Sequence, residues 1–210
     1  MATEDLTTYT EVDGNGDLTV TTSKVDFTTM PANVTDYLYD DKGASHWSGD
    51  FNIDFDFELT ATNGANVQGI LTSISNTVGI PNDSTSFMTY FETSSLTPYL
   101  ADIDSAGNWD SWAGGSNLSL NTIYYCTLSR TGNTLDWDIY SNSSRTTLVQ
   151  NITIAITNTA QTFRYVYPVS SIAIGDGSDV TGYVQNLDLN EAVASGIPIF
   201  RRRIEARKTA

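Results

Sequence analysis

The 210-residue sequence is poor in several residue types, and each shortage excludes a kind of protein. It has one cysteine, Cys126, so an intrachain disulfide cannot form, and its one histidine, His46, lies far away in the sequence. A catalytic thiol needs a basic partner nearby. We therefore interpret Cys126 as a small buried hydrophobic residue that shares a strand face with Tyr124 and Leu128, and we assign His46 no role.

Lysine and glutamate are also scarce, whereas Thr, Ser, Asn and Asp are abundant. This mixture favours strands and turns over helices. No stretch has the apolar length of a membrane span, and the acidic segment 1–10 has neither the basic start nor the apolar centre of a signal peptide. We expect no membrane partner and no signal peptide.

Basic residues are few, and half of them lie at one end of the chain. Ten Lys and Arg stand against 25 Asp and Glu, for a net charge of −15. Residues 201–210 hold five basic residues and one acid, a net +4, which leaves −19 for residues 1–200. An acidic body argues against nucleic acid as a partner. The basic end predicts a contact with another protein subunit.

What the sequence does have is alternation of apolar and polar residues. Along residues 50–59, every second residue is apolar and the others are acidic or amide, as in a strand with one buried and one wet face. Turn residues separate many such segments, which predicts one all-β domain built as a two-sheet antiparallel jelly-roll sandwich. The other expected strands are residues 17–28, 37–40, 67–75, 86–93, 97–103, 121–130, 133–141, 146–156, 162–167, 169–174 and 180–189.

Residues 121–149 form a segment in which a strand ending in Arg-Thr-Gly-Asn turns into a strand ending in Ile-Tyr-Ser. It resembles the central hairpin of the concanavalin A-like lectin/glucanase superfamily, in its laminin-G-like branch. Residues 43–51 and 182–189 are similar to the opening and closing strands of such domains. The resemblance implies a concanavalin A-like domain over residues 1–193, followed by an extended apolar and basic C-terminal arm, residues 194–210.

Residues 8–13 and 18–21 are similar to the start of uncharacterised phage and environmental proteins with this domain. The main functional hypothesis is therefore a non-enzymatic structural protein of a phage virion, a decoration, fibre or tail-associated jelly roll made in the host cytoplasm. Its partners would be other virion subunits or further copies of itself. The arm would dock through apolar anchors and an arginine cluster, namely Ile199, Phe200, Arg201, Arg202 and Arg203.

An alternative hypothesis is a lectin-like module that binds carbohydrate, such as a host-surface glycan. Trp109 and Trp112 lie three residues apart after a turn and before Gly114-Gly115. Exposed indoles can stack on the apolar faces of sugar rings, while a neighbouring acid, Asp110, binds hydroxyl groups. Tyr99 would join them across the hairpin. The competing interpretation is that the indoles are buried against the sheet.

A third hypothesis is a glycoside hydrolase. The β-glucanases of the superfamily carry alternating acids on one strand face, and Asp54, Asp56 and Glu58 have that spacing. The first acid here is Asp where the family has Glu, and the strand follows the opening motif of the domain. A solvated strand face explains the three acids more simply, so we expect no catalytic residues and no enzyme activity.

No cofactor is required, and calcium is the one that the loops would accommodate. Asp13, Asn15 and Asp17 place oxygen atoms at alternate positions, as in the first half of a calcium loop, but the twelfth position is Lys24 instead of the usual Glu. Residues 102–107 form a second fragment of this kind. Tight turns favour Asp, Asn and Gly without any metal, which is the competing interpretation for both loops.

Overall fold

A computed structural model describes residues 3–64, 68–104, 107–173 and 179–191. Within them, two single-turn 3-10 helices, η1 (Leu6–Thr8) and η2 (Pro81–Asp83), accompany fourteen strands. The strands are β1 (Thr10–Asp13), β2 (Leu18–Val20), β3 (Lys24–Pro31), β4 (Asp36–Asp41), β5 (Phe51–Asn63), β6 (Gln68–Ser75), β7 (Ser86–Glu92), β8 (Thr97–Ile103), β9 (Trp109–Gly114), β10 (Tyr124–Thr131), β11 (Thr134–Tyr140), β12 (Leu148–Ala155), β13 (Tyr165–Ser170) and β14 (Asp179–Asp188).

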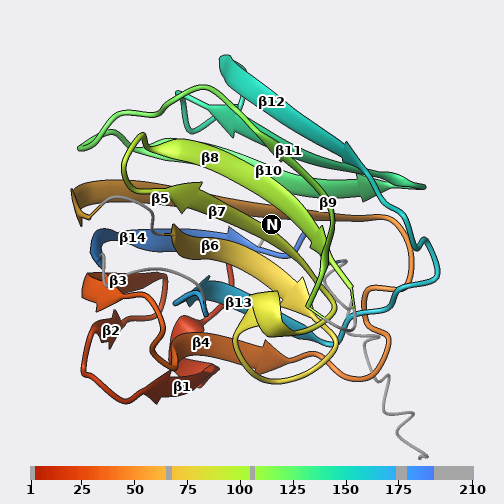
Figure 1. Cartoon of the computed structure of the whole chain (residues 1–210), viewed down its shortest axis with the longest axis horizontal. Coiled ribbons are helices and arrows are strands. Elements are labelled where there is room, and N and C mark those ends of the chain that lie inside the picture. Colours follow the sequence, from red (N-terminus) through yellow and green to blue (C-terminus); the bar gives the residue numbers. More distant parts are fainter. Residues whose placement is uncertain (1–2, 65–67, 105–106, 174–178, 192–210) are drawn as a thin grey trace, which may run out of the picture.

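The strands form two antiparallel sheets of seven, which confirms the predicted sandwich. Sheet A has the order β1-β4-β13-β6-β7-β8-β9, and sheet B has the order β12-β11-β10-β5-β14-β3-β2. In Figure 1 the strands of sheet A lie in front of those of sheet B. No helix in the described ranges is long and apolar enough to cross a membrane.

Most expected strands are present, and the differences lie at bends and sheet edges. Residues 17–28 are not one strand but the hairpin β2–β3, closed where the Thr21 N–H donates to the carbonyl of Lys24. Residues 162–167 and 169–174 contribute to one strand, β13, which has an irregularity between Val166 and Val169. Strands β1 and β9 were not among the expected segments, because neither alternates cleanly between apolar and polar residues.

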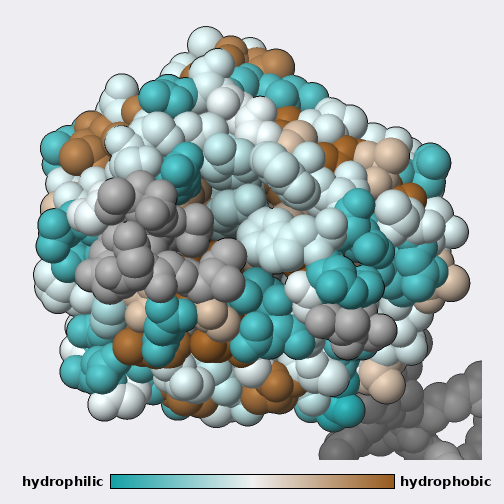
Figure 2. All heavy atoms as spheres, in the orientation of Figure 1, coloured by the Kyte–Doolittle hydropathy of each residue, from teal (hydrophilic) through white to brown (hydrophobic). Residues whose placement is uncertain are grey.

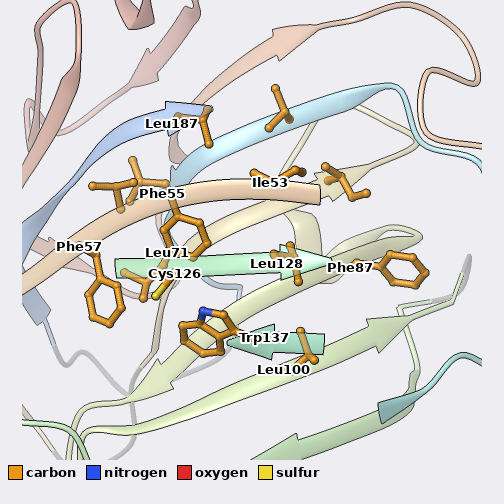
Figure 3. Packing of buried hydrophobic residues seen from close by; sticks show 14 of the residues in the cluster. Ile53, Phe55, Phe57, Leu71, Phe87, Leu100, Cys126, Leu128, Trp137 and Leu187 are labelled. Atoms are coloured by element: carbon orange, nitrogen blue, oxygen red, sulfur yellow. The ribbon is translucent and has the colours of Figure 1, made fainter. Parts of the chain in front are cut away.

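The core fills the space between the two sheets, where the apolar side of each strand points inward. Phe55 and Phe57 of β5 flank Trp137 of β11, with ring centroids 6.5 and 6.4 Å from the indole (Figure 3). Cys126 of β10 is fully buried beside them, and burial raises the pKa of its thiol. The prediction that it is a buried hydrophobic residue is confirmed.

Candidate functional site

The hairpin β8–β9 forms one edge of sheet A, and its pairing is irregular at one position. Asp102 pairs with Ser111 and Ile103 pairs with Trp109, so Asp110 is an extra residue with no partner on β8. This is a β-bulge, in which two residues oppose one and a side chain takes a new direction. The bulge determines which residues of β9 share a face.

Trp109 and Trp112 point to the same side of sheet A because of this bulge. In a regular strand, residues three apart lie on opposite faces. Here Trp112 pairs with Ala101 and Trp109 with Ile103, and those two partners are two residues apart on β8, so they share a face. The bulge thus brings both indoles to the outer face, where Tyr99 also lies.

Four aromatic side chains gather on this outer face, and we call them the aromatic group: Tyr90, Tyr99, Trp109 and Trp112. Tyr90 and Tyr99 stack with centroids 5.1 Å apart and ring planes 13° apart, and Tyr90 meets Trp109 edge-on at 5.2 Å. Tyr99 meets Trp112 at 5.9 Å. Trp112 is 58% exposed, Tyr99 and Trp109 are half-buried, and Tyr90 is buried. Burial raises the pKa of both tyrosine hydroxyls, which therefore remain protonated donors at neutral pH.

The absence of a side chain at Gly114 makes room for the Tyr99 ring. Gly114 lies opposite Tyr99 in the β8–β9 ladder, and a Cβ at that position would come within 2.5 Å of the tyrosine ring. The missing side chain lets the ring lie over β9 and reach toward Trp112. Gly114 therefore has a packing role in the aromatic group, whereas a Cβ at Gly115 would meet Gln150 and Ile152 of β12.

A second aromatic cluster lies on the β4–β13 side of the same face, and the sequence analysis did not find it. Tyr37, Tyr39, Tyr165 and Tyr167 are in mutual ring contact at 5.8–5.9 Å. The connection between β6 and β7 folds over this face, and the Tyr167 hydroxyl donates to the carbonyl of Thr77 in it at 3.1 Å. Tyr37 and Tyr167 are consequently buried, which leaves the aromatic group as the more exposed of the two.

Beside the aromatic group, three connections meet around a polar cavity of about 460 Å³. The connections join β6 to β7, β8 to β9 and β12 to β13. Figure 2 shows the outer face of sheet A, where residues of near-neutral hydropathy surround a hollow near the centre, whereas the residues that line the polar cavity are mostly hydrophilic. The residues that line the cavity include Asn76, Thr85, Asp104, Asp110, Asn158 and Gln161.

Asp102 lies fully buried next to residues that line this cavity. Its Oδ2 accepts from the Thr157 N–H at 3.3 Å, whereas its Oδ1 has no hydrogen-bond partner. Burial raises the pKa of this carboxyl, and Asp110 raises it further, while Thr157 and Gln161 lower it. A raised pKa means that ionised Asp102 destabilises the fold at neutral pH.

Replacing Asp102 with asparagine is expected to raise the free energy of unfolding at pH 7 by about 1 kcal/mol, because the amide carries no charge and supplies a donor. The folded carboxyl binds its proton more tightly than the unfolded one, so the stability of the wild type falls as pH rises between the two pKa values. The advantage of the variant should shrink as pH falls to the ordinary Asp pKa. Urea unfolding at a series of pH values measures this, and a constant difference would contradict it.

Comparison with known proteins identifies the fold but not a family. No family model and no curated protein matches the sequence. Among solved structures, a functionally unknown protein from Saccharomyces cerevisiae aligns over 90% of this chain and 99% of its own, with a TM-score of 0.58 and 12% identity. The exoplasmic/lumenal domain of VIP36 in its Ca²⁺-bound form aligns over 87% of this chain and 84% of its own, with a TM-score of 0.52 and 11% identity.

The fold is a concanavalin A-like jelly roll. At these identities, the likeness establishes the fold alone. The predicted resemblance to this superfamily is confirmed at that level.

The acids proposed for hydrolysis lie on β5, on the outer side of sheet B of the jelly roll. Asp56 is buried, and burial raises the pKa of its carboxyl. Both of its oxygens are engaged, by Arg145 at 2.9 Å and by Asn186 at 2.8 Å, and a tyrosine hydroxyl of β14 donates to Glu58 at 2.7 Å. Neither these residues nor Asp54 line the polar cavity. The contacts fit a hydrogen-bonded sheet surface.

Two of the side chains predicted to bind calcium, those of Asp13 and Asn15, make hydrogen bonds within the protein. Asp13 closes the β1–β2 turn, since its two oxygens accept from the backbone N–H groups of Gly16, Asp17 and Leu18 at 2.9–3.1 Å. The side-chain amide of Asn15 donates to a carboxylate of β4. Across the described parts of the jelly roll, no three His, Cys, Asp or Glu side chains are grouped to hold a metal ion. The Asp17 Oδ2 is buried without a hydrogen-bond partner, and calcium binding by these residues stays a prediction.

The remaining predicted site is the C-terminal arm with Ile199, Phe200, Arg201, Arg202 and Arg203. All five lie outside the described residues, as does the domain boundary at 193/194. Docking through the arm therefore stays a prediction.

Proposed function

We propose that this protein binds carbohydrate without altering it, through the aromatic group on the outer face of sheet A. The observation that carries the proposal is the convergence of Tyr90, Tyr99, Trp109 and Trp112 on one face, with Trp112 58% exposed. Single exposed apolar residues are common on proteins, but an exposed indole within a packed aromatic array offers a rigid stacking surface.

The surroundings of the aromatic group supply what a sugar needs besides stacking. Sugar hydroxyls require both donors and acceptors; the aromatic group carries two tyrosine hydroxyls, and the neighbouring residue of β9, Asp110, lines a cavity of carboxylates and amides. The fold supports the same conclusion, since the VIP36 domain has also been solved in a Ca²⁺/Man2-bound form, with a TM-score of 0.52 to this chain. The structural role in a phage virion, and a location in the virion, remain predictions.

Replacing Trp112 with alanine is expected to weaken binding to a responsive glycan at least 30-fold, because Trp at the centre of a contact contributes about 2 kcal/mol or more. The thermal unfolding temperature should hardly change, since the side chain is mostly exposed. A glycan array identifies the ligand, and calorimetric titration gives the affinity.

Leu148→Ala is the matched control, because Leu148 is 52% exposed and lies on β12, the edge strand of sheet B. It should bind the glycan as the wild type does. Trp109 is a less clean target, since it packs against a buried cluster of sheet A. Equal affinity of the Trp112→Ala variant and the wild type would refute the assigned surface, and a wild type that binds no glycan would refute the function.

A further inference from the structure

In and next to the polar cavity beside the aromatic group, two buried side-chain oxygens have no hydrogen-bond partner. Gln161 lines the cavity and is only 7% exposed, yet its Oε1 has no hydrogen-bond partner. Asp102, which adjoins Gln161, is fully buried with Oδ1 likewise unpaired. Buried polar atoms are nearly always paired, so two unpaired ones together call for an explanation. Gln161 Oε1 is an acceptor, and so is Oδ1 of the ionised Asp102 carboxyl, so a group that satisfies both must donate.

The charged side chains that line the cavity are all acidic, and the Arg130 guanidinium lies behind one wall, bonded to the carbonyls of Thr159 and Gln161. Asp104 and Asp110 line it and Asp102 adjoins it, whereas none of its lining residues is Lys, Arg or His. The chain as a whole carries −15. These carboxylates would repel a negatively charged group and attract a positively charged one. The cavity therefore disfavours uronic and sulfated sugars.

The size of the cavity favours an organic cation over a bare metal ion. A volume of about 460 Å³ lies in the range of pockets for small organic ligands. No trio of metal-binding side chains was found in the described ranges. A protonated primary amine has three donors and no acceptor, which matches acceptors that come from several sides of the cavity.

The β-bulge joins the cavity to the aromatic group. Trp109 points to the outer face of sheet A, and the next residue, Asp110, lines the cavity and accepts from the Thr157 hydroxyl at 2.9 Å. The aromatic group and the cavity are therefore linked through consecutive residues of β9. The two features form neighbouring parts of one surface.

We propose that the polar cavity is a subsite for an amino sugar, whose ammonium group is held by Gln161 and Asp110, with the buried carboxyl of Asp102 behind them. The inference rests on the proposed carbohydrate function and names its substrate class: oligosaccharides with free amines. The ammonium supplies donors to the unpaired acceptors and offsets the local negative charge. An N-acetylated sugar of the same backbone lacks that charge and binds less tightly.

The test compares two oligosaccharides of equal length, a β-1,4-glucosamine tetramer and its fully N-acetylated counterpart, by calorimetric titration at a pH where the amine is protonated. The wild type should bind the free amine about tenfold more tightly, a difference of about 1.4 kcal/mol. Asp110→Asn should remove most of this preference and weaken binding of the free amine much more than binding of the acetylated tetramer.

Asp136→Asn is the matched control, because Asp136 also accepts from a threonine hydroxyl and lies on β11 of the other sheet. It removes the same charge and should retain the preference. Equal losses in Asp110→Asn and Asp136→Asn would show attraction to the acidic surface in general and would overturn the proposal. Calcium chloride titrated alone should give no binding that Asp110→Asn abolishes, and such binding would assign the cavity to a metal ion instead.

Trp112→Ala separates this proposal from the function on which it rests. If both tetramers bind equally and Trp112→Ala abolishes both, the carbohydrate function stands and the amine subsite fails. If other glycans bind through Trp112 and neither tetramer does, the subsite fails in the same way. If no glycan of any kind binds, both fail together.

Discussion

Replacing Gly182 with alanine is expected to lower the free energy of unfolding by about 3 kcal/mol or more, the upper part of the range for overpacked positions. Gly182 lies in β14 between β5 and β3, at the centre of sheet B. A Cβ there would lie 2.2 Å from the carbonyl oxygen of Glu58, 3.0 Å from the Phe27 ring and 3.1 Å from the Cα of Leu59. Two of these three atoms belong to the backbone, which cannot rotate away.

The cost arises because β14 pairs with both neighbours through register shifts at this glycine. The ladder with β5 shifts between Thr181 and Gly182, and the ladder with β3 shifts between Val180 and Gly182. Relief of the clash would require the central strand to move away from β5. Denaturant unfolding measures the loss, and it should appear in the midpoint with little change in slope.

Gly49→Ala is the control for this prediction, because nothing lies within 4 Å of a Cβ added at Gly49. Its stability should match that of the wild type within about 0.5 kcal/mol. If Gly182→Ala unfolded at the same denaturant concentration as Gly49→Ala, the close approach of β14 and β5 would be wrong.

Replacing Arg130 with methionine is expected to destabilise the fold by about 3 kcal/mol and to loosen the connection between β12 and β13. Arg130 is only 4% exposed, and its guanidinium donates to the carbonyls of Gly132, Thr159 and Gln161 at 3.1, 2.6 and 3.5 Å. It also lies over the Phe87 ring, 5.9 Å from its centroid. Methionine preserves the packing of the stem and removes all donors.

Two of the carbonyls that would lose a hydrogen bond to Arg130, those of Thr159 and Gln161, belong to the β12–β13 connection, which lines part of the polar cavity. Gln161 lines it directly and Asn158 precedes Thr159, so the guanidinium holds one wall of the cavity in place. Backbone amides from the β12–β13 connection should exchange faster with solvent deuterium in Arg130→Met. Amine-dependent binding should weaken even under conditions where the variant is folded.

Arg164→Leu is the control, because Arg164 is exposed and its bonds run to the exposed carboxylate of Asp41. Exposed ion pairs contribute little to stability, so unfolding of this variant should resemble that of the wild type. Arg130→Lys keeps the charge but cannot reproduce a three-way fork, and it should restore only part of the loss. Full recovery with lysine would mean that the charge, and not the hydrogen-bonding geometry, matters.

The sequence predicted the strands well where the alternation is local. From Ile53 to Leu59 of β5 every second residue is a buried apolar one, in β10 every second residue is buried, and both strands lie where periodicity placed them. The hairpin from Arg130 to Thr134 was likewise visible in its turn residues. Strand β9 was missed because its residues, Trp-Asp-Ser-Trp-Ala-Gly, do not alternate between apolar and polar, since the bulge at Asp110 places two tryptophans three residues apart on one face.

The sequence predicted some residues of the candidate site, and the residues that it did not predict come from distant parts of the chain. Trp109, Trp112 and Tyr99 were identified because they flank one turn, within reach of a local argument. Tyr90 joins them from β7, and its neighbourhood depends on strand order. The same holds for Gln161, which reaches the cavity from a connection about fifty residues away from Asp110.

By itself, the sequence determined that this chain is an acidic all-β protein with two-faced strands, because alternation and turn residues act between near neighbours. Only the tertiary structure decided where its chemistry lies. The β-bulge turned Trp109 and Trp112 to one face, and the order of sheet A brought Tyr90 to them. Three distant connections enclosed the polar cavity. Such proximity arises from long-range pairing, which the residues of a single segment do not encode.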